Sequence, residues 1–384
     1  MTPSKTPLAW LQLSHERVRL VIAVLGVVFA VVLMMVQMGL QESLYDSSVI
    51  VQRSLRGDLF LLSAQSNSLL APRGFSRRRL AQTLGIPGVA AIASVSTTVG
   101  DWKSPTDGVK RTIYIVACDG REPVLDLPGV AENWDRLFIP EAILFDRRSR
   151  DDYGPIPARS ERDEIVTAEL NGKNIRVAGL FTMGPSFSAN ANVLMSEQNL
   201  QRLTGRPNGV IDLGVIRLAP GADRERIRQT LQAEMGEELR VMTRDELIRH
   251  EIDYVDRELS VGFIFQQGVV IGFLVGLVIV YQILFTDVSR HLPEYATLKA
   301  MGYTDGYLFG LVLKQSMILS ILGFVPGIAL TWIIYGITAD ATNLPMTLKP
   351  GISAFILGLT LLMCALSGLL AMRKLREADP ADVF

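Results

Sequence analysis

The sequence predicts an α-helical membrane protein with four transmembrane helices and one α+β extracytoplasmic domain, inserted between the first helix and the second. Two observations lead to this fold class. The 384-residue chain contains four long apolar runs, and its mean hydropathy of +0.28 is high for a soluble globular protein. Residues 41–260, between the first two runs, instead have the composition of a water-soluble domain. Each run reaches the roughly 20 residues that are needed to cross a bilayer.

The first apolar run covers residues 20–40, after an N-terminal segment at 1–19, and Gln37 is its polar exception. A cleaved signal peptide is the alternative interpretation of such a run. However, the run is longer than the usual signal-peptide core of roughly 7–15 residues, and no Ala-x-Ala cleavage site follows it. We therefore expect an uncleaved transmembrane helix.

The last third of the chain contains the other three runs. Gln266 and Gln267 lie near the start of the second run, where the simplest role for their amides is interhelical hydrogen bonding. We expect transmembrane helices at 261–286, 311–338 and 351–372, a cytoplasmic coupling loop at 287–310, a short periplasmic loop at 339–350 and a cytoplasmic tail at 373–384.

Basic residues in the short flanking segments predict the orientation, because such residues are enriched on the cytoplasmic side. Outside residues 41–260 there are ten Lys and Arg, and four spans place nine of them on one side and only Lys349 on the other. This asymmetry predicts cytoplasmic termini and a domain at 41–260 outside the cytoplasm. Lys314, just inside the third run, can extend to the inner interface.

The extracytoplasmic domain alternates patterns typical of strands and of helices. The strongest signal is Asn171-Gly172-Lys173 between two β-branched segments, which predicts a hairpin. We expect residues 40–55 to continue the first transmembrane helix and residues 243–259 to run into the second, as two helical stalks. Residues 146–162 are rich in Gly, Pro, Arg and Asp and resemble a loop between subdomains. Strands are expected at 88–99, 111–117, 165–170, 174–181 and 210–218, and a further helix at 222–235.

Several classes of chemistry have no sequence signature in this chain. It lacks the GxxxxGK[ST] loop that cradles ATP phosphates and the GxSxG nucleophile motif. His250-Glu251 begins like an HExxH zinc motif, but Tyr254 stands where the second histidine would be. The net charge of −1 gives no case for nucleic-acid binding. We therefore expect no catalytic residue, cofactor or metal ion in this chain.

Three glycines in the second run lie four residues apart and share one face of the expected helix. They are Gly268, Gly272 and Gly276, and such spacing allows close helix approach. Two interpretations remain open, because the face can serve routine packing within one four-helix unit or the seam of a homodimer.

The loop at 287–310 contains a second candidate site. Pro293 and Glu294 suit the first turn of a helix, because proline lacks a donor and glutamate favours the positive helix end. Residues 295–301 then form a short amphipathic helix, which Gly302 can cap in a left-handed conformation. Such a rigid projection can fit a groove on a cytoplasmic partner. A solvated connecting loop is the alternative, although it would not explain three nearby apolar residues.

This layout resembles the FtsX/MacB-type permeases of ABC transporters. The similarity covers the order of helices and domain over the whole chain, and the C-terminal residues 378–384 resemble the short tail of that family. Residues 5–20 resemble the DevC subfamily of cyanobacterial exporters. In the loop, the family pattern R-x-x-x-E-x-A-x-L-K-A-M-G is matched by Arg290, Glu294, Ala296, Leu298, Lys299, Ala300, Met301 and Gly302.

The resemblance implies partners that the residues alone do not show. It implies a separate ABC ATPase subunit that docks on the loop helix, a second permease copy in a homodimer, a periplasmic membrane-fusion (adaptor) protein and a TolC-like outer-membrane protein. Such permeases transmit motion across the membrane, and the cyanobacterial relatives export envelope glycolipid. The alternatives are an FtsX-like regulator of periplasmic cell-wall hydrolases and a membrane receptor. The ~220-residue domain argues against the regulator, whose outer domain is usually smaller.

Overall fold

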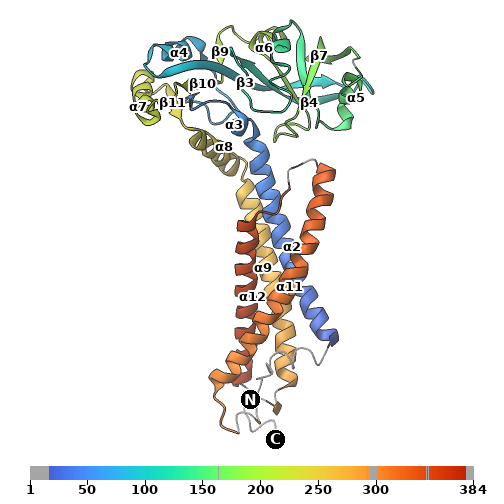
Figure 1. Cartoon of the computed structure of the whole chain (residues 1–384). Coiled ribbons are helices and arrows are strands. Elements are labelled where there is room, and N and C mark those ends of the chain that lie inside the picture. Colours follow the sequence, from blue (N-terminus) through green and yellow to red (C-terminus); the bar gives the residue numbers. More distant parts are fainter. Residues whose placement is uncertain are drawn as a thin grey trace, which may run out of the picture. The chain divides into compact units, whose positions relative to one another are not determined.

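The computed structural model of the chain describes residues 17–162, 164–291, 293–294, 297, 301–342, 344 and 346–377. The chain divides into two compact units (Figure 1). The helical unit comprises Met1–Glu42, Val261–Ala341 and Met346–Phe384, and the mixed unit comprises Ser43–Ser260 and Thr342–Pro345.

Four long helices account for the apolar runs. Each contains one of the expected spans and extends beyond it, because backbone hydrogen bonding continues into polar flanking residues where hydropathy has already fallen. Within the described residues, all four are long and apolar enough to cross a membrane. The helices are α2 (Arg17–Ser48), α9 (Val261–Arg290), α11 (Asp305–Thr342) and α12 (Pro350–Glu377).

The helical unit has an apolar core to which all four helices contribute. Two glycines of α11 lie against α2, since a Cβ on Gly323 would meet Val27 at 2.4 Å and one on Gly327 would meet Val31 at 2.8 Å. The buried Tyr335 hydroxyl, also on α11, donates a 2.5 Å hydrogen bond to the Met35 carbonyl of α2. Small residues therefore permit the close approach, and one polar contact fixes its register.

The mixed unit is built on a nine-stranded sheet of order β11-β1-β10-β3-β4-β8-β5-β7-β6. Neighbouring strands are antiparallel except for the parallel pairs β4–β8 and β5–β7. β2 and β9 form a separate two-stranded sheet. The strands are β1 (Leu59–Ser63), β2 (Phe75–Ser76), β3 (Val89–Lys103), β4 (Lys110–Asp119), β5 (Ala142–Asp146), β6 (Val166–Leu170), β7 (Lys173–Phe181), β8 (Asn192–Ser196), β9 (Val210–Ile211), β10 (Leu213–Leu218) and β11 (Leu239–Met242).

The expected hairpin is confirmed as β6–β7. Asn171 and Gly172 have φ values of 50° and 74°, the pair of positive values that a two-residue type I′ turn requires. Asparagine tolerates this region better than most residues, and glycine occupies it at no steric cost.

In its described residues, the mixed unit also contains six helices and three 3₁₀ turns. Side chains cap the N-termini of α4, α6, α7 and α8, and in α8 Thr243 and Glu246 form a reciprocal capping box. The helices are α3 (Ile50–Ser54), α4 (Arg77–Gln82), α5 (Ile156–Ser160), α6 (Glu197–Thr204), α7 (Arg224–Met235) and α8 (Arg244–Glu258), and the 3₁₀ turns are η1 (Thr83–Gly85), η2 (Trp134–Phe138) and η3 (Asp151–Tyr153).

Two expectations about the mixed unit are wrong. Residues 146–162 are not a loop between subdomains, because they include η3 and α5 and bury Tyr153 and Ile156 in the core of the single large sheet. The helix expected at 243–259 does not run on into the next one. Ser260, with φ of 54°, separates α8 from α9, because a residue in this conformation cannot continue a right-handed helix.

Candidate functional site

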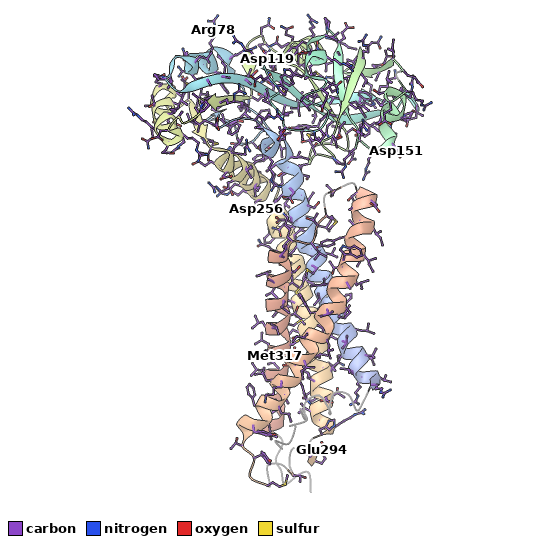
Figure 2. All side chains as sticks on the ribbon, in the orientation of Figure 1. Arg78, Asp119, Asp151, Asp256, Glu294 and Met317 are labelled. Atoms are coloured by element: carbon purple, nitrogen blue, oxygen red, sulfur yellow. The ribbon has the colours of Figure 1, made fainter. Side chains whose placement is uncertain are left out.

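The segment that follows α9 contains the residues of the expected coupling helix. Pro293 and Glu294 have helical backbone and are exposed, and Figure 2 labels Glu294. The Thr297 hydroxyl donates to the Pro293 carbonyl at 2.8 Å, and the Met301 amide donates to the Thr297 carbonyl at 3.0 Å. The Met301 bond is the backbone bond of an α-helical turn, and the Thr297 hydroxyl makes a side-chain bond across the same four-residue spacing. Gly302 then has φ of 94°, a value that suits glycine.

The described residues at the end of this segment present apolar and aromatic surface. Met301 is 64% exposed, and the exposed rings of Tyr303 and Tyr307 lie 4.8 Å apart in a tilted pair. Arg290, the last residue of α9, is also exposed. Leu298 and Lys299, two further residues of the expected site, lie outside the described residues. The visible surface is of a kind that a protein partner can cover.

The glycine face of α9 packs against α2 and α12 of the same chain. A Cβ on Gly268 would meet the Gln37 side chain at 2.5 Å, and one on Gly272 would meet Met34 at 3.0 Å. At Gly276 an added Cβ would lie 2.6 Å from Ala30 and 2.4 Å from a side chain of α12. Of the two interpretations left open, the structure favours packing within one helical unit, because this face is already occupied.

The mixed unit contains a group of contacts between residues 45–57, which comprise the end of α2, α3 and the residues after it, and the helix α8, which precedes α9. We call them the stalk clasp: Tyr45–Asp256, Gln52–Glu251 and Arg244 with the carbonyls of Leu55 and Gly57. The Tyr45 hydroxyl donates to Asp256 at 2.7 Å, and Arg244 donates to the Leu55 carbonyl at 2.6 Å. Figure 1 shows α3 and α8 together below the sheet. The clasp therefore links the two chain segments by which this unit continues into α2 and α9.

Glu251 is the buried centre of the clasp. Its carboxylate accepts the backbone amides of Leu69 and Leu70, at 2.9 and 3.3 Å, and the Gln52 and Ser68 side chains also hydrogen-bond to it. Burial raises the pKa of Glu251 to about 7, and these hydrogen bonds oppose that rise. One side chain thus joins α3, α8 and the loop after β1.

A second buried carboxyl, Glu197 at the start of α6, accepts a 2.7 Å hydrogen bond from Ser96. Burial again raises the pKa, to about 7. Arg206 and Asp212 form a bidentate ion pair in the same region, and Asp212 also accepts the Thr97 amide. These groups tie β3, α6 and the segment before β10 together, and their hydrogen bonds are those of a structural network.

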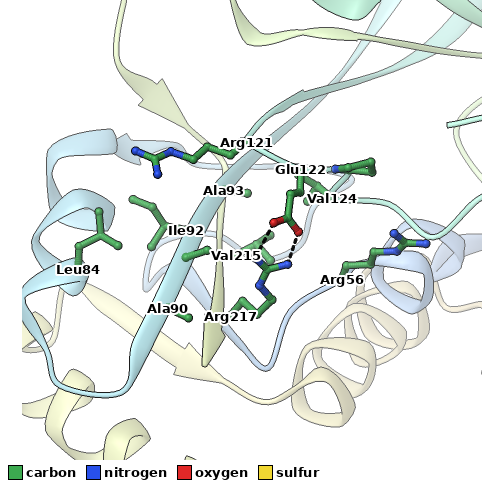
Figure 3. Close-up of a pocket in the computed structure, with 12 residues that line it drawn as sticks. Arg56, Leu84, Ala90, Ile92, Ala93, Arg121, Glu122, Val124, Val215 and Arg217 are labelled. Atoms are coloured by element: carbon green, nitrogen blue, oxygen red, sulfur yellow. Dashed lines mark hydrogen bonds and ion pairs between the residues drawn. The ribbon is translucent and has the colours of Figure 1, made fainter. Parts of the chain in front are cut away.

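A pocket of about 180 Å³ opens on the mixed unit beside β3 and β10 (Figure 3). Leu84, Ile92 and Val124 are among its apolar lining residues, and Arg217 at the rim forms a bidentate ion pair with Glu122. The pocket holds no nucleophile with an adjacent base. Throughout the described part of the chain, no three His, Cys, Asp or Glu residues are grouped as a metal site would require.

Comparison with known proteins gives a family match for the helical unit. Residues 268–380 match the family model described as FtsX-like permease C-terminal, a range that contains most of α9 and the whole of α11. This part of the chain is therefore similar to the C-terminal domain of FtsX-like permeases. Among curated proteins, none matches the chain.

Three solved domains are similar to the chain at low identity. The periplasmic region of MacB from Actinobacillus actinomycetemcomitans has 11% identity, with 53% of this chain and 95% of that chain covered and a TM-score of 0.36. The extracellular domain of the noncanonic ABC-type transporter YknZ from Gram-positive bacteria has 12% identity, 49% and 99% coverage and a TM-score of 0.35. A permease-protein domain from Porphyromonas gingivalis has 14% identity, 48% and 87% coverage and a TM-score of 0.28.

The stalk clasp was not predicted from the sequence, although one signal for it exists. Leu247, Glu251 and Val255 recur every four residues on α8 and are the buried positions of that helix. An acidic residue in an otherwise apolar stripe indicates a buried carboxylate that must have hydrogen-bond partners. The failed zinc motif drew attention to the same residue for a different reason.

Proposed function

We propose that this chain is the permease subunit of an ABC-type exporter of the FtsX/MacB type. The observation that carries the proposal is the match of residues 268–380 to the FtsX-like permease C-terminal model. Four helices of span length, with a mixed domain inserted after the first, agree with a membrane subunit. ATP hydrolysis takes place in a separate partner chain, and the permease itself is not an enzyme.

In this proposal both termini and the 287–310 segment lie in the cytoplasm, and the mixed unit lies in the periplasm. The support is the distribution of basic residues, with nine of ten on one side of four spans. The membrane is then the inner membrane of a cell with a periplasm.

The ATPase docks on the coupling segment, formed by Arg290, Pro293, Glu294, Leu298, Lys299, Met301 and Gly302. Leu298 and Met301 are three residues apart and provide apolar anchors on one helical face. Glu294 can pair with a basic group of the ATPase or stabilise the helix start. Nucleotide-driven movement of the ATPase then displaces the end of α9 and the start of α11, which flank the segment.

The stalk clasp gives this movement a route into the mixed unit. Hydrogen bonds within one folded unit join residues 45–57 to α8, so neither segment can be displaced alone without breaking them, including the buried contact between Gln52 and Glu251. Movement of the two helices is therefore delivered to the sheet as one displacement. The periplasmic adaptor and a TolC-like outer-membrane protein receive it. The chain works as a homodimer of DevC-like type, and its cargo is a glycolipid or another envelope compound.

The proposal is tested by replacing Leu298 with aspartate. A charge at a desolvated contact removes an anchor that typically contributes at least ~2 kcal/mol, which corresponds to roughly thirtyfold in affinity. We expect Leu298→Asp to fold and insert but to lose the ATPase in detergent pull-downs, with loss of export. The purified wild-type chain alone should hydrolyse no ATP, and hydrolysis should appear when the ATPase is added.

Ile165→Asp is the matched control, because Ile165 is 74% exposed on the mixed unit and the change of side chain is similar. It should leave ATPase binding unchanged. If Leu298→Asp retains the ATPase with wild-type affinity, the segment is a connector and the coupling assignment is wrong.

A further inference from the structure

The pocket beside β3 and β10 has an apolar floor of limited size. Small side chains form much of this floor, since Ala90, Ala91 and Ala93 of β3 leave space that larger residues would fill. Leu84 and Val215 add further apolar surface. The cavity volume is about 180 Å³, and a cavity of roughly 150 Å³ is enough to hold a benzene ring. The pocket therefore fits one apolar group of that size.

Three arginines, Arg56, Arg121 and Arg217, line the same pocket together with a single carboxylate, Glu122. Arg217 donates to both Glu122 oxygens, at 2.5 and 3.2 Å, and Arg56 forms an ion pair with Asp126. Arg121 has no hydrogen-bond or ion-pair partner among the residues that the structure describes. Three guanidinium groups thus face two carboxylates, and the surplus positive charge lies on Arg121.

The surplus charge lies beside the apolar part of the pocket. In Figure 3 the Arg121 side chain extends to the same side of the pocket as Leu84 and Ile92. A guanidinium presents parallel N–H donors that match the two oxygens of a carboxylate. A phosphate monoester would bring about two negative charges at neutral pH, which exceeds the surplus. A carboxylate, with one negative charge, matches it.

We propose that this pocket binds a small carboxylate whose apolar part is about the size of a benzene ring. The apolar group lies on the alanines of β3, and the carboxylate accepts hydrogen bonds from Arg121. Such a combination of apolar lining and a few polar groups that fix orientation is usual in small-molecule sites. The inference does not depend on the proposed permease function, so either can fail without the other.

Backbone hydrogen bonds connect the pocket to residues 45–57 of the stalk clasp. The Arg56 amide donates to the Val124 carbonyl at 2.7 Å, and the Asp126 amide donates to the Ser54 carbonyl at 2.6 Å. Val124 also belongs to the same buried cluster as Cys118. A ligand that binds only the folded pocket therefore slows opening of the mixed unit and protects the Cys118 thiol. The factor is one plus the ratio of ligand concentration to dissociation constant.

N-acetylphenylalanine is the probe, because it combines a benzene ring with one carboxylate. Its neutral amide has the same ring without the charge, and acetate has the charge without the ring. Saturation-transfer NMR measures binding of each compound to the full chain in detergent, and the labelling rate of Cys118 is the second readout. We expect N-acetylphenylalanine at ten times its dissociation constant to slow labelling about elevenfold. The amide and acetate at the same concentration should change it by less than about twofold.

Two substitutions test the two halves of the pocket. Arg121→Gln removes the surplus charge and should weaken binding of N-acetylphenylalanine about three- to tenfold. Arg78→Gln is its matched control and should leave binding unchanged, because Arg78 is also exposed but does not line the pocket. Ala91→Leu fills the floor and should weaken binding at least about tenfold with Arg121 intact. The Cys118 labelling rate without ligand shows whether each variant is folded.

Three outcomes overturn the inference. They are equal binding of N-acetylphenylalanine and its amide, wild-type affinity in Arg121→Gln, and the absence of any saturation transfer from the parent chain to N-acetylphenylalanine.

Discussion

Removal of the Glu251 carboxylate should loosen the mixed unit more than any exposed substitution on the same helix. In Glu251→Ala the buried amide of Leu69 and the half-buried amide of Leu70 lose their acceptor. A buried donor left without a partner costs about 1–3 kcal/mol, and this cost applies in full to the Leu69 amide. Domains are stable by only about 5–15 kcal/mol, and the change is therefore a large part of the total.

Cys118 provides the assay, because its thiol is fully buried in the same core as Leu69 and Leu247. It can react with a thiol reagent only when the mixed unit opens. In the full chain in lipid vesicles, Glu251→Ala should raise the labelling rate of Cys118 at least about thirtyfold, the ratio that corresponds to about 2 kcal/mol. Glu258→Ala, an exposed position on α8, is the control and should change it little.

The effect should depend on pH in a defined direction. Burial raises the pKa of Glu251 to about 7 from an ordinary 4.5, so the folded state binds the proton more tightly than the unfolded state. The stability from this group is complete below pH 4.5 and is lost as pH rises through 7. The labelling rate of Glu251→Ala divided by that of the wild type should therefore fall as the pH rises from 5 to 8. The expected fall is on the order of thirtyfold, which corresponds to about 2 kcal/mol of unfolding free energy.

Two results would refute this reasoning. Equal labelling of Cys118 in Glu251→Ala and in the wild type would show that the carboxylate is not needed to hold the loop after β1. A ratio that grows as pH rises would show that Glu251 stabilises the fold as a charged group, with a pKa below its ordinary value.

The remaining predictions concern the helical unit and its orientation. Cysteines placed next to Lys349 or Arg150 should react with a membrane-impermeant thiol reagent added outside the cell. A cysteine next to Lys299 should react only after the membrane is opened. Labelling near Lys299 in intact spheroplasts would contradict the four-span topology. Gly276→Leu should lower the thermal stability of the detergent-purified chain, because an added Cβ already lies 2.4 Å from a side chain of α12, whereas Gly358→Leu should not, because nothing lies within 4 Å of a Cβ there. Equal melting temperatures would rule out the packing role of Gly276.

Strands show where sequence patterns were insufficient. The strand β1, Leu59–Ser63, is entirely buried and was not predicted, because a short apolar run without alternation does not distinguish a buried strand from a helix. The alternating and β-branched segments that became β3 and β4 were predicted, as was the hairpin at Asn171-Gly172. Local sequence patterns could not predict which strands pair over long distances, since β1 pairs with β10 more than 140 residues later.

The candidate sites divide in the same way. The sequence alone singled out the three glycines of α9 but did not decide whether they pack within one helical unit or at a homodimer seam. In the structure the glycine face contacts Met34 and Ala30 of α2, which favours packing within one unit. The sequence pattern indicated Glu251 only as part of an incomplete HExxH motif and did not predict its buried hydrogen bonds.

The sequence by itself determined the long apolar helices and the tight hairpin turn. Both follow from local chemistry, because transfer of apolar residues from water and positive φ at two turn residues need no knowledge of distant neighbours. Tertiary structure alone decided the order of the nine strands, the burial of Glu251 and which face of α9 is covered. These depend on which remote segments meet, and many pairings of apolar surfaces satisfy the same local pattern until one set of contacts packs without voids or unpaired polar groups.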